Sequence, residues 1–225
     1  MGASSYFIQK HTRTIATVIL IIGGLALLRY LPVGSSIFSM SATPTPTATP
    51  DYSTWRTYNN PKYGVSLKYP LTFQARPGQI GPLAEWSLYG LTNGNEIGSI
   101  QIPRSFESRT NFDDASLRMG VSTEPIAVTD CVSPPASFGY KDTYASRTIG
   151  GVDFRKFTRS DAGAGNYYEF TSYRAVRNGG CEVLEYVVHY SNIQNYPAES
   201  GIKEYDKQKV VDSLESILDT VKFSK

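Results

Sequence analysis

His189 is the only histidine in residues 51–225 of this 225-residue chain, so catalysis by an imidazole base would have to use it. Ser-His-Asp and Cys-His mechanisms both need such a base. Glu185 falls on the same face of the predicted strand, but four residues along a strand span about 13 Å, too far for a hydrogen bond. The sequence contains no G-x-S-x-G nucleophile motif. We therefore interpret His189 as a packed histidine or one at the rim of a sheet, and we predict no catalytic residue.

Carboxylates offer a second chemistry, because glycan hydrolysis uses two acidic side chains roughly 5–10 Å apart. The candidates are Glu107, Glu169, Glu182 and Glu185. Their spacing selects no pair, so an envelope hydrolase with a carboxylate pair stays the alternative function. The adjacent acids Asp113 and Asp114 suit a cation site less well than the first turn of a helix, where they would complement its dipole. We expect no metal and no cofactor.

The segment from Gly163 to Gly165 looks like the start of a G-x-G-x-x-G phosphate-binding motif. Tyr168 stands where the third glycine would be, and the segment leads into a strand, so no helix N-terminus would meet a phosphate. We interpret this segment as a hairpin turn.

The charge of the chain is unevenly distributed along its length. The net charge of +2 divides into +3 for residues 1–50, which contain no acid, and −1 for the remaining 175. Residues 51–225 are therefore not basic, and we predict no nucleic-acid partner. Their number is that of one ordinary domain.

The charge-free segment 14–28 predicts a membrane anchor. Fifteen helical residues span about 22 Å, less than a hydrocarbon core of about 30 Å. The span therefore requires a longer, tilted helix over residues 8–31, with Arg29 reaching the interface. Basic residues before it place 1–13 in the cytoplasm and the remainder outside. We assign 14–40 to the anchor and its exit segment; a cleaved signal peptide is the alternative. The Thr/Pro-rich segment 41–50 predicts a polyproline stalk, and 51–225 an extracytoplasmic domain.

Alternating and apolar runs predict several strands in this domain. Two short runs lie around Asn59-Asn60-Pro61, and two more, 86–91 and 97–102, flank Asn93-Gly94. Three later runs cover 144–157 (broken at Gly150-Gly151), 166–176 and 181–190. In the last run both faces are largely apolar or aromatic, which indicates a central strand covered on both sides.

Two helices are predicted beside these strands. Residues 111–119 read as a short helix capped by Asn111, followed by a long loop over 121–140. Residues 203–220 are predicted to form the second helix. Their apolar stripe, which continues to the next residue, is made of Val210, Val211, Leu214, Ile217, Leu218 and Val221. The pattern predicts an α+β fold with helices packed on an antiparallel sheet.

Motifs at both ends of the domain resemble PsbP-like domains. At the start these are Trp55, Tyr58, the run 63–67 (Tyr-Gly-Val-Ser-Leu) and Tyr69-Pro70; at the end they are Leu214, Ile217, Leu218 and 221–223 (Val-Lys-Phe). The chain also resembles uncharacterised exported bacterial proteins that have one N-terminal anchor. The resemblance implies an α/β/α sandwich. No residue here matches a functional motif of PsbP, so the resemblance implies a fold but no activity.

Cys131 and Cys181 are the only cysteines, and both fall in the part of the chain that we place outside the membrane. Disulfides persist there, and both residues lie near the ends of predicted elements. We therefore predict that they form a disulfide that staples a loop to the sheet, with two separately buried thiols as the alternative.

Tyrosine is abundant, with 16 residues in the chain. Packing within the sheet accounts for most of them, and Tyr167 and Tyr196 are candidates for an exposed binding surface. We expect a membrane-anchored extracytoplasmic binding or assembly module without catalytic activity. Its monomeric ectodomain would bind a protein, a peptide or an envelope component.

Overall fold

A computed structural model describes residues 51–78, 94–133 and 139–224. The predicted anchor 14–40, the stalk 41–50 and the predicted strand 86–91 lie outside these residues. Within the described ranges, no helix has the length and apolar character needed to cross a membrane.

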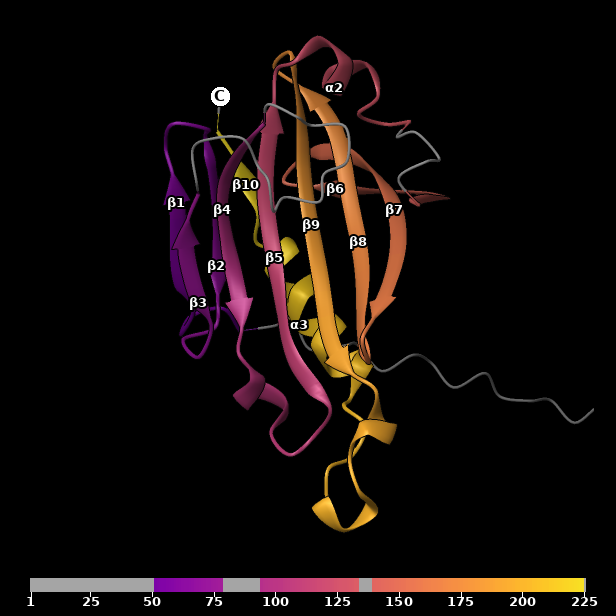
Figure 1. Cartoon of the computed structure of the whole chain (residues 1–225). Coiled ribbons are helices and arrows are strands. Elements are labelled where there is room, and N and C mark those ends of the chain that lie inside the picture. The colour runs from indigo at the N-terminus through magenta and orange to yellow at the C-terminus, as the bar shows by residue number, and fades with distance from the viewer. Residues whose placement is uncertain (1–50, 79–93, 134–138, 225) are drawn as a thin grey trace, which may run out of the picture. The chain divides into compact units, whose positions relative to one another are not determined.

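Most of the domain is one antiparallel sheet with the strand order β3-β4-β5-β9-β8-β7-β6 (Figure 1). Its strands are β3 (Gln74–Pro77), β4 (Asn95–Ile102), β5 (Phe112–Ser122), β6 (Lys141–Ile149), β7 (Val152–Gly163), β8 (Asn166–Arg177) and β9 (Gly180–Ser191). β9 lies between β5 and β8, which confirms the prediction of a central strand.

A smaller sheet has the order β1-β2-β10, with β1 (Arg56–Asn60), β2 (Val65–Tyr69) and β10 (Lys222–Phe223). Tyr58 and Asn60 of β1 both donate side-chain hydrogen bonds to the carbonyl of Ile97 in β4, at 2.6 and 3.0 Å. The small sheet is thereby fixed to the large one near the edge formed by β3 and β4.

The helix α3 (Lys207–Leu218) lies along one face of the large sheet (Figure 1). Asp206 caps it, since its side chain accepts a hydrogen bond from the amide of Lys209 at 3.0 Å. The helix buries Val210, Leu214, Ile217 and Leu218. These side chains join one core with inward-facing residues of both sheets, among them Leu117, Leu184, Val188 and Leu67. The predicted C-terminal helix is confirmed, although it is shorter at both ends.

The predicted helix over 111–119 is wrong, because these residues begin the long strand β5. The strand buries Ala115, Leu117 and Met119 on the core face, with Ser116 and Arg118 between them. This alternation has the period of a strand, and pairing with β4 and β9 on both sides stabilises it. Asn111 caps no helix; its amide nitrogen donates to the carbonyl of Ser191 and its oxygen accepts from the amide of Tyr205.

The other short helices are α2 (Pro125–Thr129), η1 (Arg104–Glu107), η3 (Ile193–Asn195) and η4 (Ala198–Ser200). α2 falls within the predicted loop 121–140. The fold is therefore α+β, as predicted, but only partly the expected α/β/α sandwich. Among the described residues only α3 covers a face of the large sheet over its length, and the short α2 lies at the opposite face near one end.

Two-residue turns with positive φ at both central positions connect β6 to β9, as in type I′ hairpins. They are Gly150-Gly151, Ala164-Gly165 and Asn178-Gly179. The prediction that 163–165 is a hairpin turn, and not a phosphate loop, is confirmed.

We expect Gly150→Ala to be more destabilising than Gly151→Ala. Both residues have positive φ, which costs an alanine about 1–2 kcal/mol. A Cβ at Gly150 would also lie 2.9 Å from the Val221 carbonyl oxygen and from the Phe223 ring, whereas at Gly151 it would meet nothing within 4 Å. Overpacking adds about 1–3 kcal/mol at Gly150 only. Urea unfolding of the two variants measures the difference; equal losses would contradict this account.

Cys131 and Cys181 form a disulfide with a Cα–Cα distance of 5.5 Å, which confirms the prediction. It connects the segment after α2 to the start of β9, and both sulfurs are buried with Ala127 and Val183. This small apolar cluster lies on the sheet face opposite the main core. The disulfide therefore holds α2 against the sheet.

Candidate ligand-binding site

The sheet face opposite α3 carries a row of polar side chains around His189. Strand pairing places four side chains in one row across it: Asp114 (β5) pairs with His189 (β9), His189 with Tyr168 (β8), and Tyr168 with Asp161 (β7). The Tyr168 ring stacks on the imidazole with 4.4 Å between ring centroids and 10° between planes. We call this set the His189 row.

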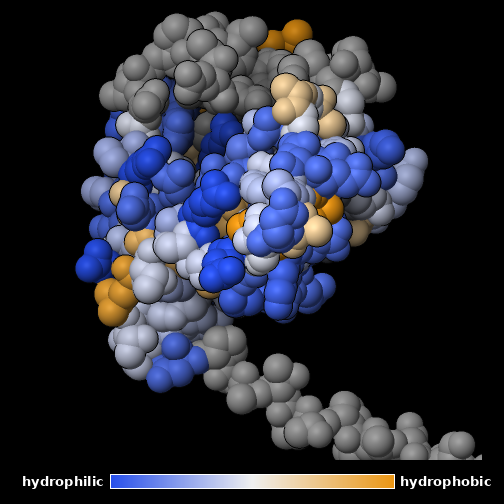
Figure 2. All heavy atoms as spheres, turned by 60° about the horizontal axis from the view of Figure 1, so that its bottom comes forward, coloured by the Kyte–Doolittle hydropathy of each residue, from blue (hydrophilic) through white to orange (hydrophobic). Residues whose placement is uncertain are grey.

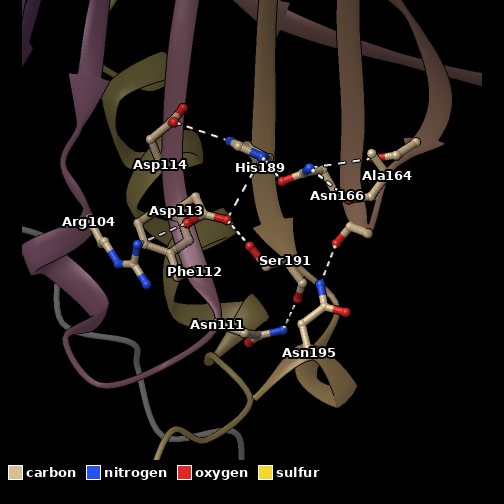
Figure 3. Close-up of polar contacts among 12 residues, drawn as sticks. Arg104, Asn111, Phe112, Asp113, Asp114, Ala164, Asn166, His189, Ser191 and Asn195 are labelled. Carbon is tan, nitrogen blue, oxygen red and sulfur yellow. Dashed lines mark hydrogen bonds and ion pairs between the residues drawn. The ribbon is translucent and has the colours of Figure 1, made fainter.

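An irregularity in β5 brings a second β5 carboxylate, Asp113, next to His189. The pairing of β5 with β9 shifts register between Phe112 and Asp114, as at a β-bulge, where an extra residue is inserted in one strand. Both Asp113 and Asp114 consequently point toward β9 (Figure 3). Asp114 Oδ2 lies 3.3 Å from His189 Nδ1, and Asp113 Oδ2 lies 3.8 Å from His189 Nε2.

His189 has a hydrogen-bond acceptor at each ring nitrogen. Its Nε2 lies 3.0 Å from Asn166 Oδ1. The Asn166 amide nitrogen donates to the carbonyls of Gly163 and Ala164, which turns its oxygen toward the histidine (Figure 3). Both ring nitrogens are thus engaged by neighbouring side chains.

Ser191 lies beside the row but does not form a catalytic triad. Its hydroxyl donates to Asp113 Oδ2 at 2.5 Å and not to the histidine. Asp113 also pairs with Arg104 at 3.3 Å. The arrangement in Figure 3 is thus a set of ion pairs and hydrogen bonds that fixes the His189 side chain. It supports the interpretation of His189 as a partly packed histidine.

A pocket of about 370 Å³ opens over the His189 row. Besides the His189 row, the pocket is lined by the adjacent row of paired residues: Ser116 on β5, Val187 on β9, Phe170 on β8 and Arg159 on β7. Arg118 on β5 also lines the pocket. Val187 and Phe170 form an apolar floor. The guanidinium of Arg159 lies 3.9 Å from the centroid of the Phe170 ring. The pocket therefore combines acids, arginines and an aromatic surface.

A buried polar cluster continues the same face beyond the pocket. Glu185, which is 1% exposed, accepts a hydrogen bond of 2.5 Å from the Tyr140 hydroxyl. Arg174, 2% exposed, stacks over the Tyr140 ring at 4.5 Å. Burial raises the pKa of Glu185, and the hydrogen bond from Tyr140 and the charges of Arg174 and Arg118 oppose that rise. Burial and the neighbouring Glu185 also raise the pKa of Tyr140.

The four glutamates considered for hydrolysis have separate partners. Glu107 pairs with Lys209, Glu169 with Lys207, Glu182 with Arg177, and Glu185 with Tyr140. In the part of the chain that the structure describes, no hydrogen bond joins two of them, and no group of three or more His, Cys, Asp or Glu side chains is arranged to hold a metal. Asp113 and Asp114 do not lie in a helix turn, which corrects our interpretation of them.

Tyr167 and Tyr196 are both partly exposed. Tyr167 stacks on Tyr190 with 5.3 Å between centroids, and its hydroxyl accepts a hydrogen bond from Asn192. Tyr190 in turn contacts Tyr205. This aromatic row lies on the α3 side of the sheet, opposite the pocket. The role of Tyr167 and Tyr196 as a binding surface stays a prediction.

The surface at the end of the sheet formed by the β7–β8 turn and residues 193–201 is mostly hydrophilic. Hydrophobic residues appear there only as small scattered spots among the coloured atoms (Figure 2). That view shows no broad apolar area for docking a helix. We therefore take the pocket at the His189 row, and not this surface, as the candidate ligand-binding site.

Sequence reasoning did not find the carboxylate partner of His189. It placed Asp114 in a helix, and so it could not bring β5 next to β9. The signal was present in Ala115, Leu117 and Met119, whose spacing has the period of a strand. The pocket residues Arg118, Arg159 and Tyr168 are ordinary polar or aromatic strand residues, and only the register across four strands unites them.

No protein-family model matches the chain, and no curated protein matches it. Among solved structures it is similar to a Bacteroides thetaiotaomicron protein, with 12% identity, a TM-score of 0.41 and 76% of this chain covered. The chain spans about half the length of that protein, 49%.

Two further solved structures are similar to this fold. LpqN of Mycobacterium tuberculosis, involved in cell envelope biogenesis, is 12% identical over 72% of this chain and 83% of its own, with a TM-score of 0.36. The cyanobacterial PsbP of Synechocystis is 8% identical over 80% and 98%, with a TM-score of 0.37. The neighbours thus include PsbP, the family that the end motifs resemble. Because all three TM-scores are below 0.5, we infer function from this chain's own residues.

Proposed function

We propose that residues 51–225 form an extracytoplasmic binding module without catalytic activity, which binds an envelope component in the pocket over the His189 row. The pocket carries this proposal. It joins charged side chains from β5 and β7 to the His189 ring of β9 and to Phe170, and convergent polar groups in a pocket are a feature of ligand sites. Strands at the centre of a sheet hold these groups in fixed positions.

The bonding of His189 favours binding over catalysis. Both ring nitrogens face acceptors, and the neighbouring Ser191 hydroxyl donates to a carboxylate. A nucleophile activated by a base requires the opposite arrangement, with the hydroxyl donating to the imidazole. Burial raises the pKa of two acids in the described residues, Glu185 and Glu96, and neither lines the pocket.

An extracytoplasmic location is supported by two features of the chain. The disulfide requires an oxidising compartment to persist. The basic residues before the apolar segment 14–28 favour an orientation with the domain outside. We propose a single-pass cell-membrane protein with the N-terminus in the cytoplasm, a stalk at 41–50 and a monomeric ectodomain.

Saturation-transfer NMR on the full chain in detergent tests the proposal, with a low-molecular-mass enzymatic digest of bacterial envelopes as the probe. We expect at least one component to show transfer from the protein and to remain chemically unchanged after prolonged incubation. Tyr168→Ala should reduce that transfer at least ten-fold, because Tyr168 lines the pocket and stacks on His189.

Tyr144→Ala is the matched control, since Tyr144 is 87% exposed on β6 and lies outside the pocket lining. Its transfer signal should equal that of the wild type. Equal signals for Tyr168→Ala and the wild type would place binding elsewhere. Steady conversion of a component into products would support the hydrolase in its place.

A further inference from the structure

A groove follows α3 on its own side of the domain. It consists of two pockets of about 430 and 420 Å³. They are neighbours, because Trp55 of the first pocket contacts Tyr52 of the second with 4.7 Å between ring centroids. Residues of α3 line the first pocket, and Asp219 and Thr220, which directly follow the helix, line the second. The two pockets together therefore run along the helix, whose 12 residues extend about 18 Å.

One wall of the groove is aromatic, and the small sheet fixes it. Trp55 directly precedes β1 and Pro70 directly follows β2, so these two residues lie side by side at the end of the strand pair, and both line the first pocket. The Trp55 side chain is partly exposed and packs against the main core. The Thr220 hydroxyl accepts a hydrogen bond from the amide of Lys68 at 2.8 Å, which fixes β2 to the end of α3. These contacts hold the aromatic wall at a set distance from the helix.

The opposite wall is the exposed side of α3, which carries short polar side chains. Gln208, Asp212 and Ser216 recur at every fourth residue and therefore lie in one line along the helix. The Gln208 amide nitrogen donates to Asp212 Oδ1 at 2.7 Å. This bond uses one amide hydrogen and one carboxylate oxygen, so the second hydrogen of Gln208 can donate to a ligand and Asp212 Oδ2 can accept from it. The wall thus offers a donor and an acceptor side by side.

Donors and acceptors beside a large aromatic ring match the chemistry of a sugar. A sugar hydroxyl can donate and accept at once, whereas a carboxylate only accepts and an ammonium group only donates. The C–H groups on the face of a sugar ring form an apolar surface that packs on an indole. Two charged groups of the first pocket are already engaged, since Asp206 caps α3 and Lys209 pairs with Glu107, which favours an uncharged ligand there. A proline-rich peptide also packs on aromatic grooves, but it has few N–H groups to donate to Asp212.

We propose that the groove along α3 binds an uncharged oligosaccharide, with one sugar ring on Trp55, hydrogen-bonded to Asp212 and Gln208, and a further ring beside Tyr52. This site is separate from the pocket over the His189 row, because the two share none of their described lining residues. It gives the domain a second binding function, directed to glycans.

Cellotetraose, a chain of four glucose units, is the test probe. It is titrated by NMR into the isotope-labelled full chain, in a detergent without a sugar headgroup. The indole N–H signal of Trp55 should shift, and glucose should bind at least ten-fold more weakly because it reaches only one pocket. A peptide with the sequence of residues 42–49, Ala-Thr-Pro-Thr-Pro-Thr-Ala-Thr, should not shift this signal. Tighter binding of the peptide than of cellotetraose, or no shift with cellotetraose, would overturn the proposal.

Two substitutions test the named contacts. Trp55→Leu keeps an apolar side chain against the core but removes the ring, so it should weaken cellotetraose at least ten-fold, measured on the amide signals of α3. Asp212→Ala should weaken it about five-fold through the lost acceptor. Tyr144→Ala and Glu199→Ala are the matched controls, because both residues are exposed and lie outside the groove lining, and their affinities should equal that of the wild type.

Circular dichroism melting verifies that each variant folds. If Trp55→Leu does not fold, Asp212→Ala decides, since Asp212 is exposed on the helix. Wild-type affinity in the folded variants would contradict the proposal. Tyr168→Ala, which tests the pocket over the His189 row, should leave cellotetraose binding unchanged. A loss of cellotetraose binding in that variant would place the sugar in the other pocket and overturn the proposal, so the two sites succeed or fail separately.

Discussion

Reducing the Cys131–Cys181 disulfide is expected to lower the free energy of unfolding by about 4 kcal/mol, the chain-entropy value for a closed loop of this length. The bond joins residues 50 apart in the sequence. Without it the unfolded chain gains the freedom of that loop, and α2 loses its covalent connection to β9. Such a loss is a large part of the 5–15 kcal/mol that stabilises a typical domain.

Urea unfolding with and without reductant measures this effect on the full chain. The double variant Cys131→Ala, Cys181→Ala should be destabilised to a similar extent, and adding reductant to it should change nothing. Both sulfurs are buried, so thiol counting is done in denaturant. A reductant-independent midpoint for the wild type would show that the bond contributes little to stability.

Glu185→Ala is expected to destabilise the domain by roughly 3–5 kcal/mol, the cost of breaking a buried charged cluster. The substitution leaves the Tyr140 hydroxyl without its acceptor and removes the carboxylate near Arg174. Both neighbours are buried, so water replaces little of what is lost. Thermal and urea unfolding measure the change; a loss below 1 kcal/mol would contradict the role of the cluster.

Glu185→Gln separates the charge from the shape of the side chain. Gln keeps an acceptor for Tyr140, so its loss of stability should be smaller than that of Ala. Because burial raises the pKa of Glu185 from its ordinary 4.5, the wild type binds this proton more tightly when folded. The stability that this proton contributes is fully present below pH 4.5, and it is lost as the pH rises through the pKa of Glu185 in the folded protein. Stability relative to Glu185→Gln should therefore decrease with rising pH, and parallel pH profiles would contradict the assignment.

The hairpins from β6 to β9 were predictable because their turn residues and alternating runs are local signals. Gly150-Gly151 and Asn178-Gly179 each sit between runs with strand periodicity, and the structure places turns at both pairs. The helix α3 was equally predictable, because its apolar residues recur with the period of a helix. In 111–119, by contrast, capping residues gave a helix signal that competed with the strand period. Long-range pairing with β4 and β9 decides in favour of the strand, and sequence windows do not contain that pairing.

The candidate site was less predictable than the fold. His189 and Glu185 were recognisable as polar residues in an apolar strand, and their separation along it excludes a direct hydrogen bond. The hydrogen-bond partners of the histidine, Asp114 and Asn166, come from two other strands, and the position of Asp114 depends on the irregularity at Asp113. A single inserted residue in a strand pairing leaves no composition signal, so register had to come from the structure.

The disulfide also bears on the order in which the sheet assembles. β6 to β9 are connected by two-residue turns, so their pairing closes only short loops, whereas β5 and β9 join residues as distant as Phe112 and Tyr190. Ser122 pairs with Cys181 at the end of this ladder, close to the disulfide. Oxidation before folding therefore shortens the loop that must close when β5 pairs with β9, and it fixes the end at which this pairing begins. A chain that is oxidised early should therefore fold faster than a reduced one, with the same final register.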